Sequence, residues 1–236
     1  QPSVGALCPF AEAGVGAVAT QSIVEPRYGP RGLEAMHGGE SPSEALSRLL
    51  GEDDGRELRQ VAFVDVQGRV AAHTGSRCIA YAGHVLGEGF SCQANMMRHE
   101  GVPEAMAAAF TSAEGALAHR LLAALDAAEA TGGDIRGMQS AALIVVGEGS
   151  RLDRRVDDHP DPLRELRRLV DLGRDNPEGW FWDGVQKAFA GAPEEGAELV
   201  KRAYAADESW RELLRRLPPT GLLPDEPVVL DRLLSL

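Results

Sequence analysis

Residues 59–74 read RQVAFVDVQGRVAAHT and contain the clearest secondary-structure signal in the chain. Residues 61–64 form a β-branched and aromatic run, residues 67–68 (QG) are typical of a turn, and residues 70–73 form a second short run. Two such runs joined by a short glycine-containing turn predict a β-hairpin.

The sequence on the N-terminal side of this hairpin predicts a strand and two helices. Residues 13–20 (AGVGAVAT) are small and apolar, which predicts a buried strand close to another backbone. Residues 26–39 read as a turn and a short helix that ends at two glycines. Ser41 can cap a further helix, Pro42 suits its first position and Glu44 completes a capping box.

The C-terminal side adds a strand at residues 89–95, helices at 103–112 and 115–130, and a core strand at 140–146 (SAALIVV). Strands followed by a helical pair and another strand indicate an α+β fold with antiparallel sheets. The regular strand–helix alternation of a parallel sheet is not observed.

After Pro160 the pattern becomes helical. Helices are expected from residue 162 and over 177–190, 193–206, 208–217 and 228–236, and residues 180–210 hold half of the twelve large aromatic residues. We therefore expect one domain over residues 1–174 and a small all-α extension over residues 175–236.

Composition limits the classes of partner. The 236 residues carry a formal net charge of −12, with 44% hydrophobic and 25% charged residues, which is ordinary for a globular protein. The net negative charge argues against nucleic-acid and anionic-membrane partners, so a small-molecule substrate is expected. No apolar run reaches the roughly 20 residues of a spanning helix. Three cysteines suit a reducing cytoplasm, and a homodimer would be the commonest oligomer.

Long strings of this sequence resemble one bacterial and archaeal family, domain of unknown function ten twenty-eight, which is placed among Ntn-hydrolase-like proteins. The strings are AEAGVGAVATQS (11–22), PRYGPRGLE (26–34), GRVAAHTGSRC (68–78), AGHVLGEGFSCQANMM (82–97), GGDIRGMQSAALIVV (132–146) and RVDDHPDP (155–162). The tail is similar to a helical-repeat extension that many members carry. The resemblance implies a four-layer αββα sandwich of antiparallel sheets.

The resemblance also implies hydrolysis of amide bonds. Active members of this fold use an N-terminal Thr, Ser or Cys as the nucleophile, and its own α-amine serves as the base. Such an amine has an unperturbed pKa of about 8, so a modest decrease leaves it neutral near pH 7. Because the sequence begins at Gln1, we expect that two family strands and the nucleophile lie outside it.

Two residues are candidates for catalysis. Asn95, in the string QANMM, could donate a hydrogen bond to a developing oxyanion, or it could simply close a turn. His73 could act as an acid or base, although a lone histidine at a strand end more often satisfies backbone groups. His84 is interpreted in the same way as His73.

Five residues are candidates for substrate binding. Arg136 could hold a substrate carboxylate, or it could pair with Asp134 and fix the loop. Arg31 could line an anionic pocket or lie on the surface at a helix start. Gln21 follows an apolar strand, where its side chain needs a partner. Gln139 leads from the same loop as Arg136 into the core strand.

The carboxylates and histidine at residues 157–161 match no established metal-site spacing, and Asp161 is explained as a helix cap. We expect neither a metal nor a cofactor. The leading hypothesis is a hydrolase of amide bonds in a small, anionic substrate. The alternative is a non-catalytic binding or assembly module that retains the fold, and a metal-dependent hydrolase is a third hypothesis.

Overall fold

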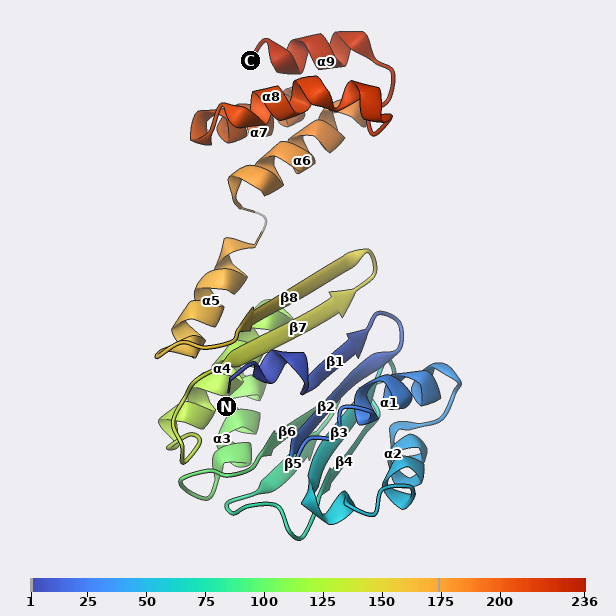
Figure 1. The fold of residues 1–236 in the computed structure, drawn as a ribbon, viewed down its shortest axis with the longest axis vertical. Helices are drawn as coiled ribbons and strands as arrows, with labels where there is room; N and C mark the ends of the chain where they lie inside the picture. The colour runs from blue at the N-terminus through green and yellow to red at the C-terminus, as the bar shows by residue number, and fades with distance from the viewer. Residues whose placement is uncertain (1, 174) are drawn as a thin grey trace. The chain divides into compact units, whose positions relative to one another are not determined.

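The computed structural model describes residues 2–173 and 175–236. The chain divides into two compact units, Gln1–Val170 and Asp171–Leu236, and each is described by itself. The first unit is a mixed α+β structure with antiparallel sheets, and the second is helical (Figure 1).

A four-stranded antiparallel sheet organises the first unit. Its strands lie in the order β1 (Pro9–Glu12), β2 (Gly16–Ser22), β3 (Arg59–Asp65) and β4 (Val70–Thr74). The register of β3 and β4 pairs Gln60 with Thr74 and Val64 with Val70. The hairpin predicted from residues 59–74 is therefore confirmed.

One face of this sheet packs against helices α1 (Tyr28–His37) and α2 (Pro42–Gly51). Val61 and Phe63 of β3 are buried in the core beneath these helices. At Gly32 of α1, a Cβ atom would lie 2.6 Å from Cζ of Phe63, so glycine is needed for this close approach. The predicted capping box is present at the start of α2, because Ser41 Oγ accepts a hydrogen bond from the Glu44 backbone N–H.

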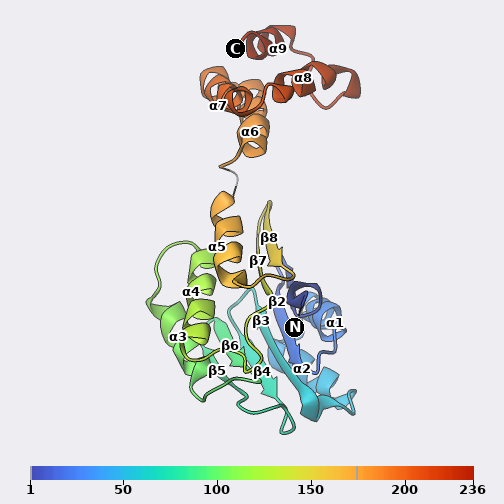
Figure 2. The ribbon, with the colours of Figure 1, turned by 60° about the vertical axis from the view of Figure 1, so that its left-hand side comes forward.

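The opposite face of the sheet packs against the hairpin of β5 (Gly83–Gly87) and β6 (Phe90–Ala94). Side chains alternate between the faces of a strand. Since Val61 and Phe63 point toward α1 and α2, Gln60 and Ala62 point toward β5 and β6. Helix α3 (Val102–Ser112) packs on this hairpin in turn, and Figure 2 shows the sheets between the α1–α2 and α3–α4 pairs.

A third hairpin completes the first unit. It is formed by β7 (Ala141–Gly147) and β8 (Ser150–Val156) and packs with α4 (Leu117–Ala130) and α5 (Pro162–Leu172). Leu122, Leu143 and Leu166 are buried in their common core. Short 3₁₀ turns occur at Val4–Ala6 (η1) and Arg56–Leu58 (η2).

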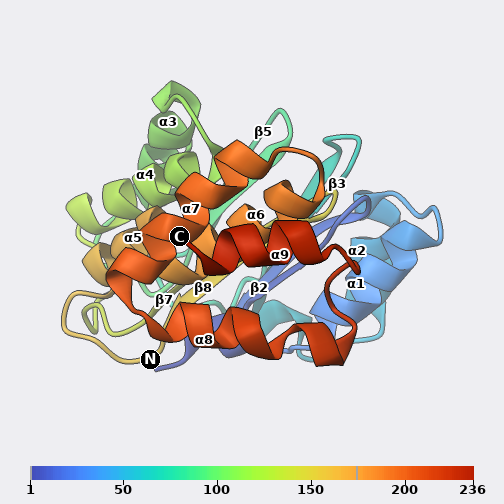
Figure 3. The same ribbon diagram turned by 90° about the horizontal axis from the view of Figure 1, so that it is seen from above.

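The second unit contains α6 (Pro177–Phe189), α7 (Pro193–Ala206), α8 (Ser209–Arg216), a 3₁₀ turn at Pro218–Thr220 and α9 (Pro227–Leu234). Phe181, Val200 and Leu214 form its buried core. Helices α6 and α7 pack closely at two glycines: a Cβ atom on Gly196 would lie 2.5 Å from the carbonyl oxygen of Gly184. Helices α8 and α9 both contact α7 (Figure 3).

Three strands were not predicted, namely β1, β5 and β8. Two of them are short, and β8 (SRLDRRV) alternates between exposed charged residues and partly buried positions. The predicted strand at residues 13–20 begins and ends later, at Gly16–Ser22, because residues 13–15 form a turn. Within the described ranges, no helix is long and apolar enough to cross a membrane.

Candidate functional site

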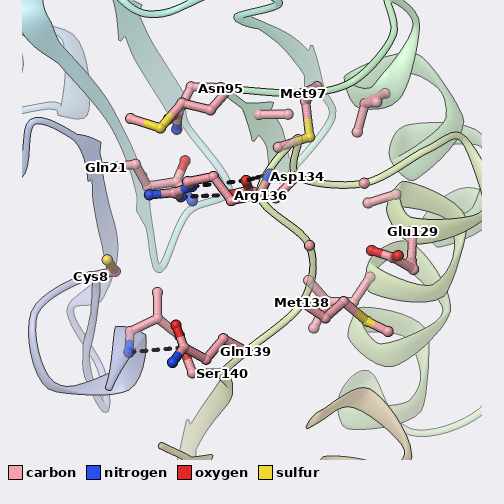
Figure 4. Close-up of a pocket in the computed structure, with 18 of the residues that line it drawn as sticks. Cys8, Gln21, Asn95, Met97, Glu129, Asp134, Arg136, Met138, Gln139 and Ser140 are labelled. Carbon is pink, nitrogen blue, oxygen red and sulfur yellow. Dashed lines mark hydrogen bonds and ion pairs between the residues drawn. The ribbon is translucent and has the colours of Figure 1, made fainter. Parts of the chain in front are cut away.

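A cavity of about 270 Å³ lies in the first unit, where β2 ends and where the loops after β6 and before β7 meet. Five of the predicted site residues line it, namely Gln21, Asn95, Asp134, Arg136 and Gln139. They come from three segments that lie far apart in the sequence, around residues 21, 95 and 134–139, and Figure 4 shows their side chains around one space. The cavity offers room for a molecule of on the order of ten non-hydrogen atoms.

Asn95 is held by a buried glutamine that the sequence did not single out. Its Nδ2 donates a hydrogen bond of 3.0 Å to Oε1 of Gln60, a residue with no exposed surface. Nε2 of Gln60 lies 2.8 Å from the carbonyl oxygen of Ala94, and 3.0 Å from both the carbonyl oxygen of Gly83 and Oγ1 of Thr74. One side chain thus connects β3, β4, β5 and β6 and the loop that carries Asn95.

The strand register explains why this glutamine lies beside the cavity. Gln60 is directly opposite Gln21 on β2 and Thr74 on β4. Cross-strand partners share a face of the sheet, so the three polar side chains form a row on the face toward β5 and β6. Thr74 Oγ1 also lies 2.8 Å from Nδ1 of His84 on β5.

Two polar atoms beside the cavity are buried without a partner. Within the part of the chain that the structure describes, Oε1 of Gln21 and Oγ of Ser22 make no hydrogen bond. A buried polar atom without a partner is costly, so each such atom in a folded protein calls for an explanation. Groups of this kind are suited to a bound ligand.

The backbone is strained at two positions that line the cavity. Ser22 has φ 68° and Met96 has φ 59°, a left-handed conformation that non-glycine residues rarely adopt. Strain of this kind concentrates at functional sites, where it persists because the surrounding structure enforces it. Both residues directly follow a polar candidate, Gln21 and Asn95 respectively, so the strained positions accompany the candidate side chains.

The charged pair of the predicted loop is formed. Nε of Arg136 donates to Oδ1 of Asp134 at 2.9 Å, and Nη2 lies 2.6 Å from Oδ2. Burial acts to raise the pKa of Asp134, but hydrogen bonds from the side chain and backbone of Arg136 outweigh it and lower the pKa. The same pair raises the pKa of Arg136. Both groups are therefore charged at neutral pH, and the interpretation of this pair as a loop clamp is supported.

The lower edge of the cavity in Figure 4 is formed by Gln139 and Ser140. Nε2 of Gln139 donates to Oδ1 of Asp158 at 3.1 Å. Oγ of Ser140 accepts from the backbone N–H of Val4 at 3.2 Å. These contacts fix the start of β7 against the N-terminal segment and the loop after β8.

The remaining wall is rich in sulfur. Met96, Met97, Met106 and Met138 line the cavity and are four of the five methionines in the chain. Cys8 lines it as well, and burial raises the pKa of its thiol to about 11. Methionine side chains are flexible and polarisable, so this wall can adapt to ligands of different shape.

Two predicted site residues lie elsewhere. Nε2 of His73 is 2.9 Å from the carbonyl oxygen of Arg56, so this histidine satisfies a backbone group. Nη2 of Arg31 on α1 pairs with Oε2 of Glu52 at 2.5 Å, beside a smaller pocket of about 70 Å³. Neither residue is among those that line the cavity of Asn95.

Side chains of the acidic segment at residues 157–161 form ion pairs and hydrogen bonds with residues close by in the sequence. Asp157 pairs with Arg155, Nδ1 of His159 accepts from the backbone N–H of Asp161, and Oδ1 of Asp161 accepts from the backbone N–H of Arg164. Among residues 2–173 and 175–236, no group of three or more His, Cys, Asp or Glu side chains could hold a metal ion.

Comparison with known proteins identifies the family. A model of the "Family of unknown function (DUF1028)" matches residues 1–166. The crystal structure of protein SPO2555 from Silicibacter pomeroyi, titled with the same family model, is 30% identical and superimposes with a TM-score of 0.68, covering 72% of this chain and 78% of that one. No curated protein matches the chain.

Proposed function

This chain belongs to the DUF1028 family, and we propose that its first unit is an amide-bond hydrolase of the Ntn type that acts on a small substrate bearing a carboxylate. In this proposal the cavity beside Asn95 is the active site, and the second unit is a helical extension. The protein binds no nucleic acid or membrane, requires no cofactor, and works in the cytoplasm as a homodimer.

The packing of the first unit supports the fold that this proposal requires. Helices α1 and α2 pack on the four-stranded sheet, the β5–β6 hairpin packs on its other face, and α3 packs on the hairpin. This order is compatible with a four-layer αββα sandwich. We propose that the β5–β6 and β7–β8 hairpins belong to one layer, because α3 and α4, which contact each other, contact one hairpin each.

The observation that carries the proposal is the convergence of amide and charged side chains at one cavity. Asn95 supplies an N–H donor of the kind that stabilises an oxyanion, an effect that is commonly the largest electrostatic contribution in acyl transfer. Gln21 and Ser22 add buried polar atoms without partners. Asp134 occupies Nε and Nη2 of Arg136, which leaves its Nη1 edge for a substrate carboxylate.

The attacking group is proposed to be the N-terminal Thr, Ser or Cys of the mature protein. Sequencing the N-terminus of the protein purified from its native source tests this point. A terminal residue with a hydroxyl or thiol is the expected result. A mature terminus without either group would refute the Ntn mechanism.

Turnover is tested with a panel of N-acetyl amino acids and their neutral primary amides, with the released amine measured by fluorescamine. We expect the mature protein to hydrolyse the acids in preference to the neutral amides. Asn95→Ala should lower kcat about 100-fold or more, because loss of an oxyanion donor typically has an effect of this size. Gln67→Ala, in the exposed turn after β3, is the matched control and should retain full turnover.

A specific observation favours the non-catalytic alternative. Of the lining thiol and hydroxyl groups, Cys8 is held protonated by burial, the Ser22 hydroxyl has no hydrogen-bond partner in the described part of the chain, and the Ser140 hydroxyl accepts from the backbone N–H of Val4. A binding module of the same fold would bind N-acetyl amino acids without releasing amine. Isothermal titration calorimetry measures binding of the N-acetyl amino acids, and the amine assay measures their hydrolysis. Binding without amine release indicates the binding module, whereas amine release indicates the hydrolase.

A further inference from the structure

Gln60 is a buried polar side chain of the first unit that the proposed reaction does not use. It has no exposed surface, and its amide group contacts Thr74, Gly83, Ala94 and Asn95. Hydrogen bonds to Thr74, Gly83 and Ala94 would be enough to satisfy the polar groups of the strands. The additional hydrogen bond to Asn95 reaches the loop after β6.

The orientation of the Gln60 amide is fixed by its surroundings. Nε2 faces two backbone carbonyl oxygens, of Gly83 and Ala94, which can only accept hydrogen bonds. A reversed amide would place Oε1 against both oxygens, lose both hydrogen bonds and bring acceptors together. Oε1 of Gln60 must therefore point the other way, toward Asn95.

This fixed orientation determines how Asn95 is presented to the cavity. Oε1 of Gln60 can only accept a hydrogen bond, and the donor of the Asn95 amide is its NH2 group, so this group lies on that side at 3.0 Å. A free asparagine amide could rotate by 180° and exchange its NH2 and carbonyl ends. With Gln60 in place, one N–H of Asn95 is bound and the other remains available as a donor.

We propose that Gln60 is the positioning residue of this site: it locks the Asn95 amide with its donor end presented, so that an oxyanion meets an N–H and not a carbonyl oxygen. This inference rests on the proposed role of Asn95 as oxyanion donor. Gln60 itself does not touch the substrate. Its role is to make the donor orientation of Asn95 permanent before the substrate arrives, which is the preorganisation that such donors require.

The test compares Gln60→Met with Thr74→Val. Gln60→Met keeps the length of the side chain and removes the acceptor for Asn95. Thr74→Val removes one partner of Gln60 but leaves the Gly83 and Ala94 carbonyls to orient the amide, so it is the matched control. The first readout is the side-chain NH2 signal pair of Asn95 in a ¹⁵N–¹H correlation spectrum, assigned by its absence in Asn95→Ala.

We expect slow hydrogen exchange at one Asn95 N–H in the wild type and in Thr74→Val, and at least a tenfold faster exchange in Gln60→Met. In the amide assay, Gln60→Met should lower kcat between 10- and 100-fold with KM unchanged, whereas Thr74→Val should stay within twofold. A Gln60→Met variant with an unaltered Asn95 signal would overturn the inference, and so would a Thr74→Val variant with an equally altered signal.

Two further outcomes are informative. If Gln60→Met does not fold, Gln60→Glu replaces it, because Glu retains an acceptor for Asn95 while losing the amide donors. Protection of the Asn95 N–H should then fall, because the contacts with the Gly83 and Ala94 carbonyls that direct Oε1 toward Asn95 are lost. Unaltered protection in Gln60→Glu would count against positioning by these contacts. If the wild type hydrolyses no amide, the proposed function fails, yet the spectrum still decides whether Gln60 orients Asn95.

Discussion

Gly196 of α7 allows two helix backbones of the second unit to approach more closely than any side chain would permit. A Cβ atom there would lie 2.5 Å from the carbonyl oxygen of Gly184 and 2.6 Å from the backbone nitrogen of Ala188. Ordinary contacts begin near 3.4 Å, so Gly196→Ala must push the helices apart by almost 1 Å. Overpacking of this kind costs about 1–3 kcal/mol, and the upper end applies because both neighbouring atoms are backbone atoms.

A second effect acts in the opposite direction, since alanine is favoured over glycine in a helix by about 1 kcal/mol. The expected net result is a decrease of about 2 kcal/mol in the free energy of unfolding of the second unit. For a unit of this size, that corresponds to a fall in Tm on the order of 10 °C.

Tryptophan fluorescence can follow this unit alone, because Trp180, Trp182 and Trp210 are the only tryptophans in the sequence. Urea unfolding monitored by fluorescence should therefore show the shift, while far-UV circular dichroism follows both units. Gly51→Ala, at the end of α2 in the first unit, is the control for the circular-dichroism transition: its Cβ would meet nothing within 4 Å, so it should leave that transition unchanged or move it slightly higher, with no change in the fluorescence transition. A Gly196→Ala midpoint equal to or above that of the wild type would refute the packing argument.

Ser41→Ala removes the N-cap of α2 and should destabilise the first unit by about 1 kcal/mol in urea unfolding followed by circular dichroism; no shift of the midpoint would contradict the role of the cap. The pKa of Asp53 is lowered, chiefly by its hydrogen bond from Arg59, so this ion pair stabilises the fold above about pH 4 and is lost as the pH falls further. Asp53→Asn should therefore reduce stability at pH 7 and flatten its decline toward pH 3, and an unchanged pH profile would count against the pair. The Cys8 thiol, with a pKa of about 11, should react with iodoacetamide slowly at pH 8 and about tenfold faster per pH unit above it; mass spectrometry of the labelled peptide measures the rate, and rapid labelling at pH 8 would disprove its burial.

Local sequence patterns predicted the elements whose signals are strong. The β3–β4 hairpin follows from its apolar runs and glycine turn, and the start of α2 follows from Ser41 and Glu44. Helices α6, α7 and α9 of the second unit begin at prolines, which the sequence places at 177, 193 and 227. Strand β5 (GHVLG) escaped prediction because it is short and bounded by glycines.

The candidate site was predictable only in part. Asn95, Asp134 and Arg136 were singled out because they lie in strings that resemble the family, and the structure brings them to one cavity. Gln60 was missed because it stands beside an apolar run and its polar partners come from three other strands. Only the register, which pairs Gln60 with Gln21 and Thr74, places these groups together.

The face of the sheet around Gln60 is built from small residues, with Ala62 on β3 directly opposite Ala72 on β4. Alanine is short enough to let the β5–β6 backbone settle within reach of a single glutamine side chain. Larger residues such as valine at these two positions would lift the β5–β6 hairpin and detach Asn95 from its anchor without changing any residue that lines the cavity.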